Sequence, residues 1–560
     1  MGRGVKRHGS RRVAVTAVVI AQASLTGQAF ALEFDTGNAD LKMRWDNTVK
    51  YSTAFRVKDR SDALVTDNPA ANRNTLNLDD GDRNFGRGLI SNRLDLLSEF
   101  DLSYQGRLGM RVSGAAWYDS VYNRSNDNDA PDRVNQTSVP FNEFTDATRK
   151  LHGRDGEILD AFVFANGSLG SMPANLRLGK HTLLYGETLF FGGNGIANAQ
   201  SPVDVVKLLS VPNSQFKETI LPVNQVSGQI QLRDNLALGG YYQFEFRESR
   251  IPGVGSYFSN ADILGEGAER FLFAPGVGAP RMADKKARDS GQFGSQLRWR
   301  PESLDSEFGF YAVQYHDKGP QAYLRPLGLP PPLGLGAPYP LNFQLVFPED
   351  IKSYGISFST TLGDFNVAGE ASVRRNTPLV SSPQVDASPD GSAGTGNSAL
   401  YAVGNSAHMN LSGVLLLKPT ALWQGGTFLG EIAWNRRTSI TKNAAALDPN
   451  TSRDALGLRT VFEPQWFQVA PNVDISMPIG LGYNLQGNSS VVANFNGGTR
   501  QGGDLSLGLN AVYRQKWRFG LNWTHYLGSE GAALGADGHF TFKQSYADRD
   551  FVSLSVQTTF

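Results

Sequence analysis

The sequence predicts an all-β protein, a transmembrane antiparallel β-barrel of about 14 to 18 strands. In the C-terminal segment, residues 551–560, apolar residues alternate with small polar residues, and this last strand ends on Phe560. No run of ~18 apolar residues follows the N-terminal region, so a membrane-spanning helix is excluded. Aromatic residues reach 11%, with 61 glycines. A chain that lives in lipid without apolar helices must close its backbone hydrogen bonds in a barrel, with aromatic girdles at the interfaces.

Residues 1–31 have the order of a secretory signal peptide. Residues 1–12 are basic without an acid, residues 13–21 form an apolar run too short to span a bilayer, and Ala29-Phe30-Ala31 supplies a small-x-small cleavage site. We therefore expect an exported protein whose mature chain starts at Leu32. Residues 32–560 are expected to form one barrel.

Charge and cysteine content exclude several classes of function. The signal segment holds five of the 53 basic residues and none of the 53 acidic ones, so the mature chain carries a net charge of −5. No basic stripe is present, so nucleic acid is not expected as a partner. The chain has no cysteine, which excludes disulfides, thiolate metal sites and cysteine nucleophiles.

Alternating segments recur along the mature chain as hairpins. Residues 226–233 alternate apolar with polar side chains, Asp234-Asn235 makes a turn, and residues 236–246 resume the alternation. The same pattern surrounds further turns, at residues 105–107, 362–364 and 515. One such segment also suits a half-buried strand of a soluble β-protein, but a series predicts a membrane barrel. The least regular hairpins lie near Pro419 and near residues 477–480.

Long polar stretches separate the hairpins. They comprise residues 58–88, 122–153, 247–288, 319–350, 438–463 and 528–549. In bacterial barrels the short turns face the periplasm, the long loops face outside, and both termini are periplasmic. With residues 41–55 as the first strand, this assignment closes with about 18 strands, an even number as such barrels require.

Several sequence blocks resemble a family catalogued as domain of unknown function 1302. They are residues 77–85 (NLDDGDRNF), 90–93 (ISNR), 98–101 (SEFD), 176–180 (LRLGK), 185–188 (YGET), 201–204 (SPVD) and 548–554 (DRDFVSL). The resemblance extends over the mature length. It implies an outer-membrane barrel of proteobacteria, related in style to channels that admit hydrophobic compounds such as long-chain fatty acids. It implies no particular substrate.

The connection at residues 181–221 is a candidate for a structure inside the barrel. It contains a glycine-rich stretch and a short amphipathic piece at residues 203–209, and it starts on the side of the long loops. Long loops often carry function. Folded inward, the segment would form a constriction or partial plug, and Val205 and Leu208 could contact a hydrophobic solute. A surface loop packed on its neighbours is an equally open alternative.

Strand parity places many charged side chains on the inner face of the barrel. They are Asp95, Glu99, Asp101, Arg111, Arg177, Glu245, Arg298, Arg300, Glu370, Arg374 and Glu431. Lys180 has the opposite parity to Arg177, and we include it because it lies at the end of its strand. Charges inside a barrel need partners or water. A salt-bridge lattice that stiffens the wall is the favoured interpretation, and an electrostatic lining that orients solutes is the functional one.

The tryptophans divide by parity. Trp45, Trp299, Trp517 and Trp523 share the apolar faces of their strands, which predicts girdle anchoring at the membrane interfaces. Trp117 instead shares the inner face with Asp119. It is therefore the tryptophan expected to contact a solute.

Two groups of carboxylates lie in the long loops. They are Asp79, Asp80 and Asp82, and separately Asp127, Asp129 and Asp132. Such groups could bind Ca²⁺, but the second lacks the glycine and distal glutamate of an EF-hand loop. Solvated acidic loops are the favoured interpretation, and we expect no metal or other cofactor.

Catalysis is not expected. Among the histidines of the mature chain, only His408 stands two residues from a serine, Ser406, and no acid lies nearby in sequence to orient it. A nucleophile elbow, a zinc-binding HExxH helix and a phosphate loop are all absent from the sequence. An enzyme whose site is assembled across strands is the alternative.

The sequence thus predicts an outer-membrane channel that passively admits small hydrophobic or amphipathic molecules. A porin for polar solutes and a structural surface barrel with a plugged lumen are the alternatives. The expected partners are outer-membrane lipid and lipopolysaccharide, a small hydrophobic solute, and the barrel-assembly machinery during biogenesis.

Overall fold

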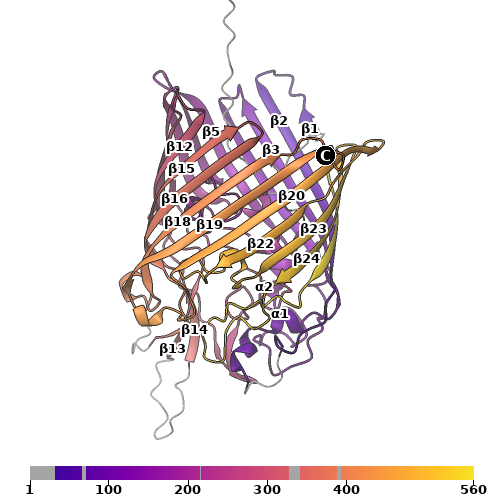
Figure 1. The fold of residues 1–560 in the computed structure, drawn as a ribbon, viewed down its shortest axis with the longest axis vertical. Coiled ribbons are helices and arrows are strands. Elements are labelled where there is room, and N and C mark those ends of the chain that lie inside the picture. Colours follow the sequence, from indigo (N-terminus) through magenta and orange to yellow (C-terminus); the bar gives the residue numbers. More distant parts are fainter. Residues whose placement is uncertain (1–31, 66–70, 213, 215, 327–340, 387–391) are drawn as a thin grey trace, which may run out of the picture.

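The computed structural model describes residues 32–65, 71–212, 214, 216–326, 341–386 and 392–560. The signal peptide expected at residues 1–31 lies outside these residues. Within them, the chain forms one large antiparallel sheet that closes on itself as a barrel (Figure 1).

The barrel has 18 strands, which confirms the fold class predicted from the sequence. The sheet contains 20 named strands, of which β1 (Leu32–Phe34) only flanks β2, and two consecutive strands form a single crossing. The strands of the wall are β2 (Leu41–Arg56), β3 (Gly88–Tyr104), β4 (Leu108–Asp119), β5 (Arg154–Leu169), β6 (Met172–His181), β7 (Val223–Arg233), β8 (Leu236–Gln243), β11 (Gln292–Trp299), β12 (Ser306–Tyr315), β15 (Ile351–Leu362), β16 (Phe365–Pro378), β18 (Val403–Leu416), β19 (Gly425–Lys442), β20 (Asp454–Ala470), β21 (Val473–Ser476), β22 (Ile479–Gln486), β23 (Gly503–Tyr513), β24 (Trp517–Leu527) and β25 (Phe551–Thr559).

The first and last strands of the wall close the barrel. Residues Thr48 to Arg56 of β2 pair antiparallel with β25, and Asn47 exchanges two backbone hydrogen bonds with Phe560, of 2.8 and 2.9 Å. The C-terminal aromatic residue thus completes the ladder. Closure leaves neither of these two strands as an unpaired edge, as a wall surrounded by lipid requires.

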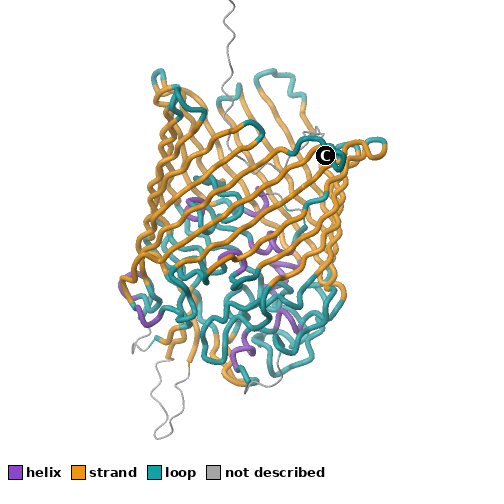
Figure 2. Tube along the Cα trace, viewed as in Figure 1, coloured by secondary structure: helices purple, strands orange, loops and turns teal. Residues whose placement is uncertain are grey.

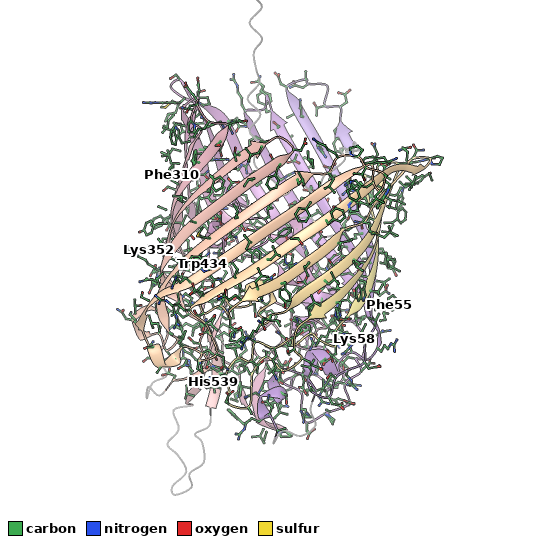
Figure 3. All side chains as sticks on the ribbon, viewed as in Figure 1. Phe55, Lys58, Phe310, Lys352, Trp434 and His539 are labelled. Atoms are coloured by element: carbon green, nitrogen blue, oxygen red, sulfur yellow. The ribbon has the colours of Figure 1, made fainter. Side chains whose placement is uncertain are left out.

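Side chains alternate between the two faces of the wall as the sequence predicts. The outer face carries aromatic and aliphatic residues such as Phe55 and Phe310, which point away from the barrel (Figure 3). The inner face of β2 carries Asp46, Lys50 and Arg56, all buried. The apolar exterior and polar interior are those of a transmembrane barrel.

Short turns join the strands at one end of the barrel, which we call the turn end. In the β3–β4 turn, Gln105 and Gly106 both have positive φ, 53° and 66°, the conformation that two-residue hairpins of right-handed twist require. The C-terminus lies at this end (Figure 1). At the opposite end, the loop end, the connections are long.

Two details differ from the sequence-based expectation. Residues 438–463 are mostly strand, because β19 continues to Lys442 and β20 begins at Asp454; their polar residues extend the ladder beyond the apolar band. Near residues 477–480 the chain does not turn. Pro478 lacks an N–H and instead interrupts one crossing between β21 and β22, while the turn lies before β21.

The loops contain small elements of their own. At the loop end, β9 (Arg270–Ala274) pairs with β10 (Val277–Pro280), and β13 (Gln321–Pro326) pairs with β14 (Leu341–Val346) and β17 (Gln384–Val385). The α-helices are α1 (Asp80–Arg83), α2 (Asp146–Thr148), α3 (Val205–Ser210) and α4 (Phe216–Thr219). Shorter turns of 3-10 or π type are η1 (Arg73–Asn77), η2 (Arg149–Gly153), η3 (Ile196–Ala199), η4 (Gly396–Ser398), η5 (Ala444–Ala446) and η6 (Phe495–Gly497). No helix in the described part of the chain is long and apolar enough to cross a membrane.

Leu411→Arg tests the assignment of the outer face. Leu411 lies on β18 with half of its side chain exposed, so the substitution places a charge in the apolar band. We expect the free energy of unfolding in lipid vesicles, measured by denaturant titration, to fall by about 2–4 kcal/mol. Leu422→Arg, in an exposed connection at the turn end, should change it little. Equal stability of the two variants would contradict the assignment.

Candidate functional site

The segment that joins β6 to β7 turns into the interior of the barrel. It contains η3, α3 and α4, and helices and loops are visible inside the wall in Figure 2. Its backbone forms hydrogen bonds to side chains on β16, β18 and β19, more than 170 residues away along the chain. We call residues 182–222 the inward segment.

Two carboxylates on the wall bind backbone N–H groups of the inward segment. Glu370 on β16 accepts hydrogen bonds from Glu187 N, at 2.7 Å, and Ile196 N, at 2.8 Å. Glu431 on β19 accepts from Leu189 N and Phe191 N, both at 3.1 Å, and also from the intervening N–H of residue 190. Both carboxylates are buried. They therefore fix this part of the backbone rather than face a water-filled channel.

A guanidinium group holds the adjacent carbonyl groups. Arg374 on β16 donates hydrogen bonds to the carbonyl oxygens of Gly193, Asn194 and Gly195, at 3.0, 2.8 and 2.8 Å. A side chain at Gly195 would collide with the carboxylate of Glu370, so glycine is needed for this close approach. Glu370 and Arg374, four residues apart on β16, thus bind N–H groups and carbonyl groups of the same loop.

Ser406, His408 and Asn194 form a chain of hydrogen bonds between wall and inward segment. Ser406 Oγ lies 2.8 Å from His408 Nε2, and His408 Nδ1 lies 3.0 Å from Asn194 Oδ1. The order of hydroxyl, imidazole and orienting amide is that of a nucleophilic triad. However, Ser406 is 1% exposed and His408 2% exposed, so the hydroxyl has no open approach. The arrangement attaches the inward segment, and the absence of catalysis stays a prediction.

Other predicted inner-face charges pair along the wall. Arg93 binds both oxygens of Asp95, and Arg111 binds both oxygens of Asp101 at 2.9 Å and lies 3.8 Å from Glu99. Arg298 pairs with Glu307 on the adjacent strand, nearer the turn end. These pairs form the salt-bridge lattice that the parity predicted.

Arg177 and Lys180 are not brought together. Arg177 lies over the ring of Phe162, at 5.7 Å from the centroid. Lys180 follows Gly179, which has a φ of +121°, and donates a hydrogen bond of 2.6 Å to the carbonyl of Ile158. Lys180 thus has a backbone carbonyl as its partner, and the pairing of β6 with β5 and β7 continues through it without a register shift.

The amphipathic piece of the inward segment forms α3 near Trp117. The carboxylate of Asp204 caps α3 by accepting a hydrogen bond from Lys207 N at 2.9 Å. Val205 is half-buried, whereas Leu208 is 61% exposed and free to contact a solute. The Lys207 ammonium lies 5.6 Å from the Trp117 ring centroid.

Trp117 lies at the base of a cavity of about 590 Å³. The ring is only 6% exposed, and its Nε1 donates a hydrogen bond of 3.0 Å to the carbonyl of Lys150. The guanidinium groups of Arg93 and Arg250 lie 5.5 and 5.9 Å from the ring centroid. Arg250 is held in turn by Glu157, at 2.7 and 2.9 Å.

The cavity lies at the loop end and has a mixed lining. Its apolar residues include Leu151, Leu221, Phe246, Ile251, Leu264, Leu345 and Phe347. Its charged residues are Asp146, Lys150, Asp155, Arg247, Glu248, Arg250, Glu266, Arg281, Asp284 and Lys286. Sites that bind small molecules are generally apolar with a few placed polar groups, and this lining shares the apolar surface but carries more charge.

The sequence missed several residues of this site. Arg93 has the same parity as Asp95 and could have been found by extending the pattern by one position. Asn194, Lys207 and Arg250 lie on connections without periodicity, so parity gives no information on them. Only the fold brings them to the wall.

The chain matches one protein family over almost its whole length. The family described as "Protein of unknown function (DUF1302)" matches residues 11–560. A comparison with curated proteins finds no match. Among solved structures, OccAB3 of Acinetobacter baumannii has a TM-score of 0.44 and 11% identity, over 92% of this chain and 99% of that chain. OpdK of Pseudomonas aeruginosa with vanillate has a TM-score of 0.38 and 10% identity, over 92% and 98%. OmpT, an outer-membrane protein of Vibrio cholerae, has a TM-score of 0.37 and 9% identity, over 95% and 100%.

Glu431→Ala tests the attachment of the inward segment. The substitution leaves several backbone N–H groups without their acceptor, which should cost at least about 3 kcal/mol locally. We expect faster hydrogen exchange at the amides of residues 187–196, measured by mass spectrometry of the folded barrel. Glu302→Ala, an exposed carboxylate near the turn end, is the matched control and should leave these amides unchanged. Unchanged exchange in Glu431→Ala would show that the attachment is not needed.

Proposed function

The chain belongs to the DUF1302 family, and we propose that it is an outer-membrane channel that passively admits small hydrophobic or amphipathic molecules. The observation that carries the proposal is the cavity lined in part by Trp117, which joins apolar surface to basic and acidic groups at the mouth of a barrel whose interior holds the inward segment. A solute of this class would bind in the cavity before it passes.

The proposed location follows from the surface of the barrel. A closed wall with an apolar outer face is suited to lipid, and long loops of bacterial barrels face the outside of the cell. We therefore place the loop end outside and the turn end in the periplasm, reached through the signal peptide proposed at residues 1–31. Lys352 lies on the outer face near the loop end (Figure 3), where a cation could contact lipopolysaccharide.

The cavity favours a molecule with an apolar body and one anionic group. The ring of Trp117 and the side chains of Leu221 and Phe246 offer apolar contact. Arg247 and Arg250 lie beside them and can bind an anionic head. Such a solute would leave water on the outside, bind here, and move down its concentration gradient past the inward segment.

Passage requires that part of the inward segment moves. The backbone of residues 187–196 is held by Glu370, Arg374 and Glu431. The helices α3 and α4 are held through side chains instead, by the ion pair of Asp204 with Arg250 and that of Lys217 with Glu99, and we take them as the movable part. Leu208 is exposed on α3, whose Lys207 contacts the Trp117 ring. We propose that displacement of α3 opens the route.

A porin for polar solutes is the second candidate, and the ten charged side chains that line the cavity favour it. The two differ in kinetics, because a binding site saturates with solute concentration whereas diffusion through an open aqueous pore does not. Large stable ion currents in a planar bilayer would support the porin.

Trp117→Ala tests the role of the cavity. The purified protein is placed in liposomes, and entry is measured for octane-1-sulfonate, a permanent anion with an apolar chain, and for glucose. We expect saturable entry of the sulfonate that slows about tenfold in the variant, or about 1.4 kcal/mol, because the apolar base of the cavity is lost. Trp117→Phe should retain part of the rate.

The control is Trp423→Ala, which removes a tryptophan from an exposed turn at the other end of the barrel. It should leave sulfonate entry unchanged. Sulfonate entry that is unaffected in Trp117→Ala, or glucose entry as fast as sulfonate entry, would contradict the proposed function.

A further inference from the structure

Three carboxylates from two separate loops meet inside the packed loops of the loop end, which we call the cap. Asp79 and Asp80 precede and begin α1, between β2 and β3, while Asp262 lies between β8 and β9. One oxygen of each lies within 4.8 Å of an oxygen of the other two. All three side chains are at most 1% exposed. Asp82 is buried too, so the expectation of a solvated acidic loop is wrong for Asp79, Asp80 and Asp82.

The first of these carboxylates is paired with basic side chains. Asp79 Oδ2 accepts a hydrogen bond from Arg83 Nε at 2.8 Å and lies 3.5 Å from Arg133. The charge of the nearby Asp82 is also balanced, because Asp82 Oδ1 lies 2.8 Å from Arg56 Nη1. The negative charge of Asp79 is therefore balanced within the protein.

The other two carboxylates lack a cation. Asp80 Oδ2 accepts from Asn135 N at 3.1 Å, and Asp262 Oδ2 accepts from Asp80 N at 3.2 Å. Within the described ranges, neither Asp80 nor Asp262 forms an ion pair with a basic side chain. Oδ1 of Asp79, of Asp80 and of Asp262 is buried without any hydrogen-bond donor, and so is the neutral Oδ1 of Asn135. These four oxygen atoms can each accept a hydrogen bond, but none of them receives one from the described part of the chain.

Burial of unpaired carboxylates opposes their ionisation. Burial, and next the charge of Asp79, raises the pKa of Asp80 to about 7, and burial with the charge of Asp80 raises the pKa of Asp262. A folded state with raised pKa values binds protons that the unfolded chain releases. Without a ligand, the contribution of these two carboxyl groups to stability is therefore fully present below about pH 4 and is lost as the pH rises towards 7.

We propose that Asp79, Asp80 and Asp262 bind one divalent cation, with Ca²⁺ preferred. The two uncompensated charges of Asp80 and Asp262 match a charge of +2. The ligands on offer are carboxylate oxygens with a neutral amide oxygen nearby, which are ligands of hard cations. Ca²⁺ accepts irregular oxygen geometry, whereas Mg²⁺ demands a near-ideal octahedron and keeps several waters, which this buried site does not favour.

The ion would join three connections of the cap. Asn77, on the same loop as Asp79, already accepts a hydrogen bond from Asp262 N at its carbonyl, at 2.7 Å, and one from Asn135 Nδ2 at Oδ1, at 2.8 Å. A cation at the carboxylates strengthens this junction. The inference does not depend on the proposed channel function.

Calorimetric titration tests the site. The protein is refolded in detergent free of lipopolysaccharide, since that lipid binds Ca²⁺ itself, and CaCl₂ is titrated at pH 7.5. We expect one saturable site per chain, with affinity lowered at least tenfold in Asp262→Asn and in Asp80→Asn, which keep the side-chain shape but remove a charge. Asp132→Asn, an exposed carboxylate on the same loop as Asn135, is the control and should bind as the wild type does.

A second measurement on the wild type avoids dependence on the variants, whose folding is checked by heat-dependent gel mobility. Ca²⁺ should slow proteolysis within residues 71–85 and 255–266, and a chelator should reverse this effect. No saturable Ca²⁺ binding, equal affinity in Asp262→Asn, or proteolysis that responds to pH but not to Ca²⁺ would overturn the proposal. The last result would identify a carboxyl pair that shares a proton.

Discussion

Closure of the wall determines where the polar groups of this protein can lie. A backbone group that faces hydrocarbon must find its hydrogen-bond partner inside the protein, so the β2–β25 ladder has to complete the cylinder. Once the sheet is closed, period-two alternation sends every second side chain into an interior that lipid cannot reach. The polar and charged residues of this chain are thereby concentrated in a space that must either hold water or be filled by protein.

This chain fills much of that space with its own backbone. Glu370, Arg374 and Glu431 could have lined an aqueous pore, but each binds peptide groups of the inward segment instead. Buried charges are tolerated only when they are fully hydrogen-bonded, and a loop with exposed N–H and C=O groups supplies such partners. The wall and the inward segment therefore satisfy one another, and a cavity lined in part by Trp117 remains at the loop end.

Sequence periodicity predicted the wall well and the loops poorly. The inward parity of Glu370, Arg374 and Glu431 followed from alternation alone, because register in a barrel allows one choice of face. The partners of these side chains could not be predicted, because they are backbone atoms. For Glu370 and Arg374 these atoms lie more than 170 residues away along the chain. Asp79 and Asp80 were expected in solvent but are buried, because packing between long loops follows no period. Lys180 was included among the inner-face charges against its strand parity, and it instead donates a hydrogen bond to the carbonyl of Ile158.

A reversible lock on the inward segment distinguishes its fixed part from its movable part. The chain has no cysteine, so a Gly193→Cys, Val492→Cys pair introduces the only disulfide; a Cβ at Gly193 would lie 3.7 Å from Val492 Cγ1. Residues 187–196 are already fixed, so the disulfide should leave sulfonate entry unchanged. In a separate Leu208→Cys variant, a bulky thiol-reactive group coupled to α3 should block sulfonate entry until the group is removed. Entry lost on locking residue 193, or entry unaffected by the group at residue 208, would contradict the proposed route.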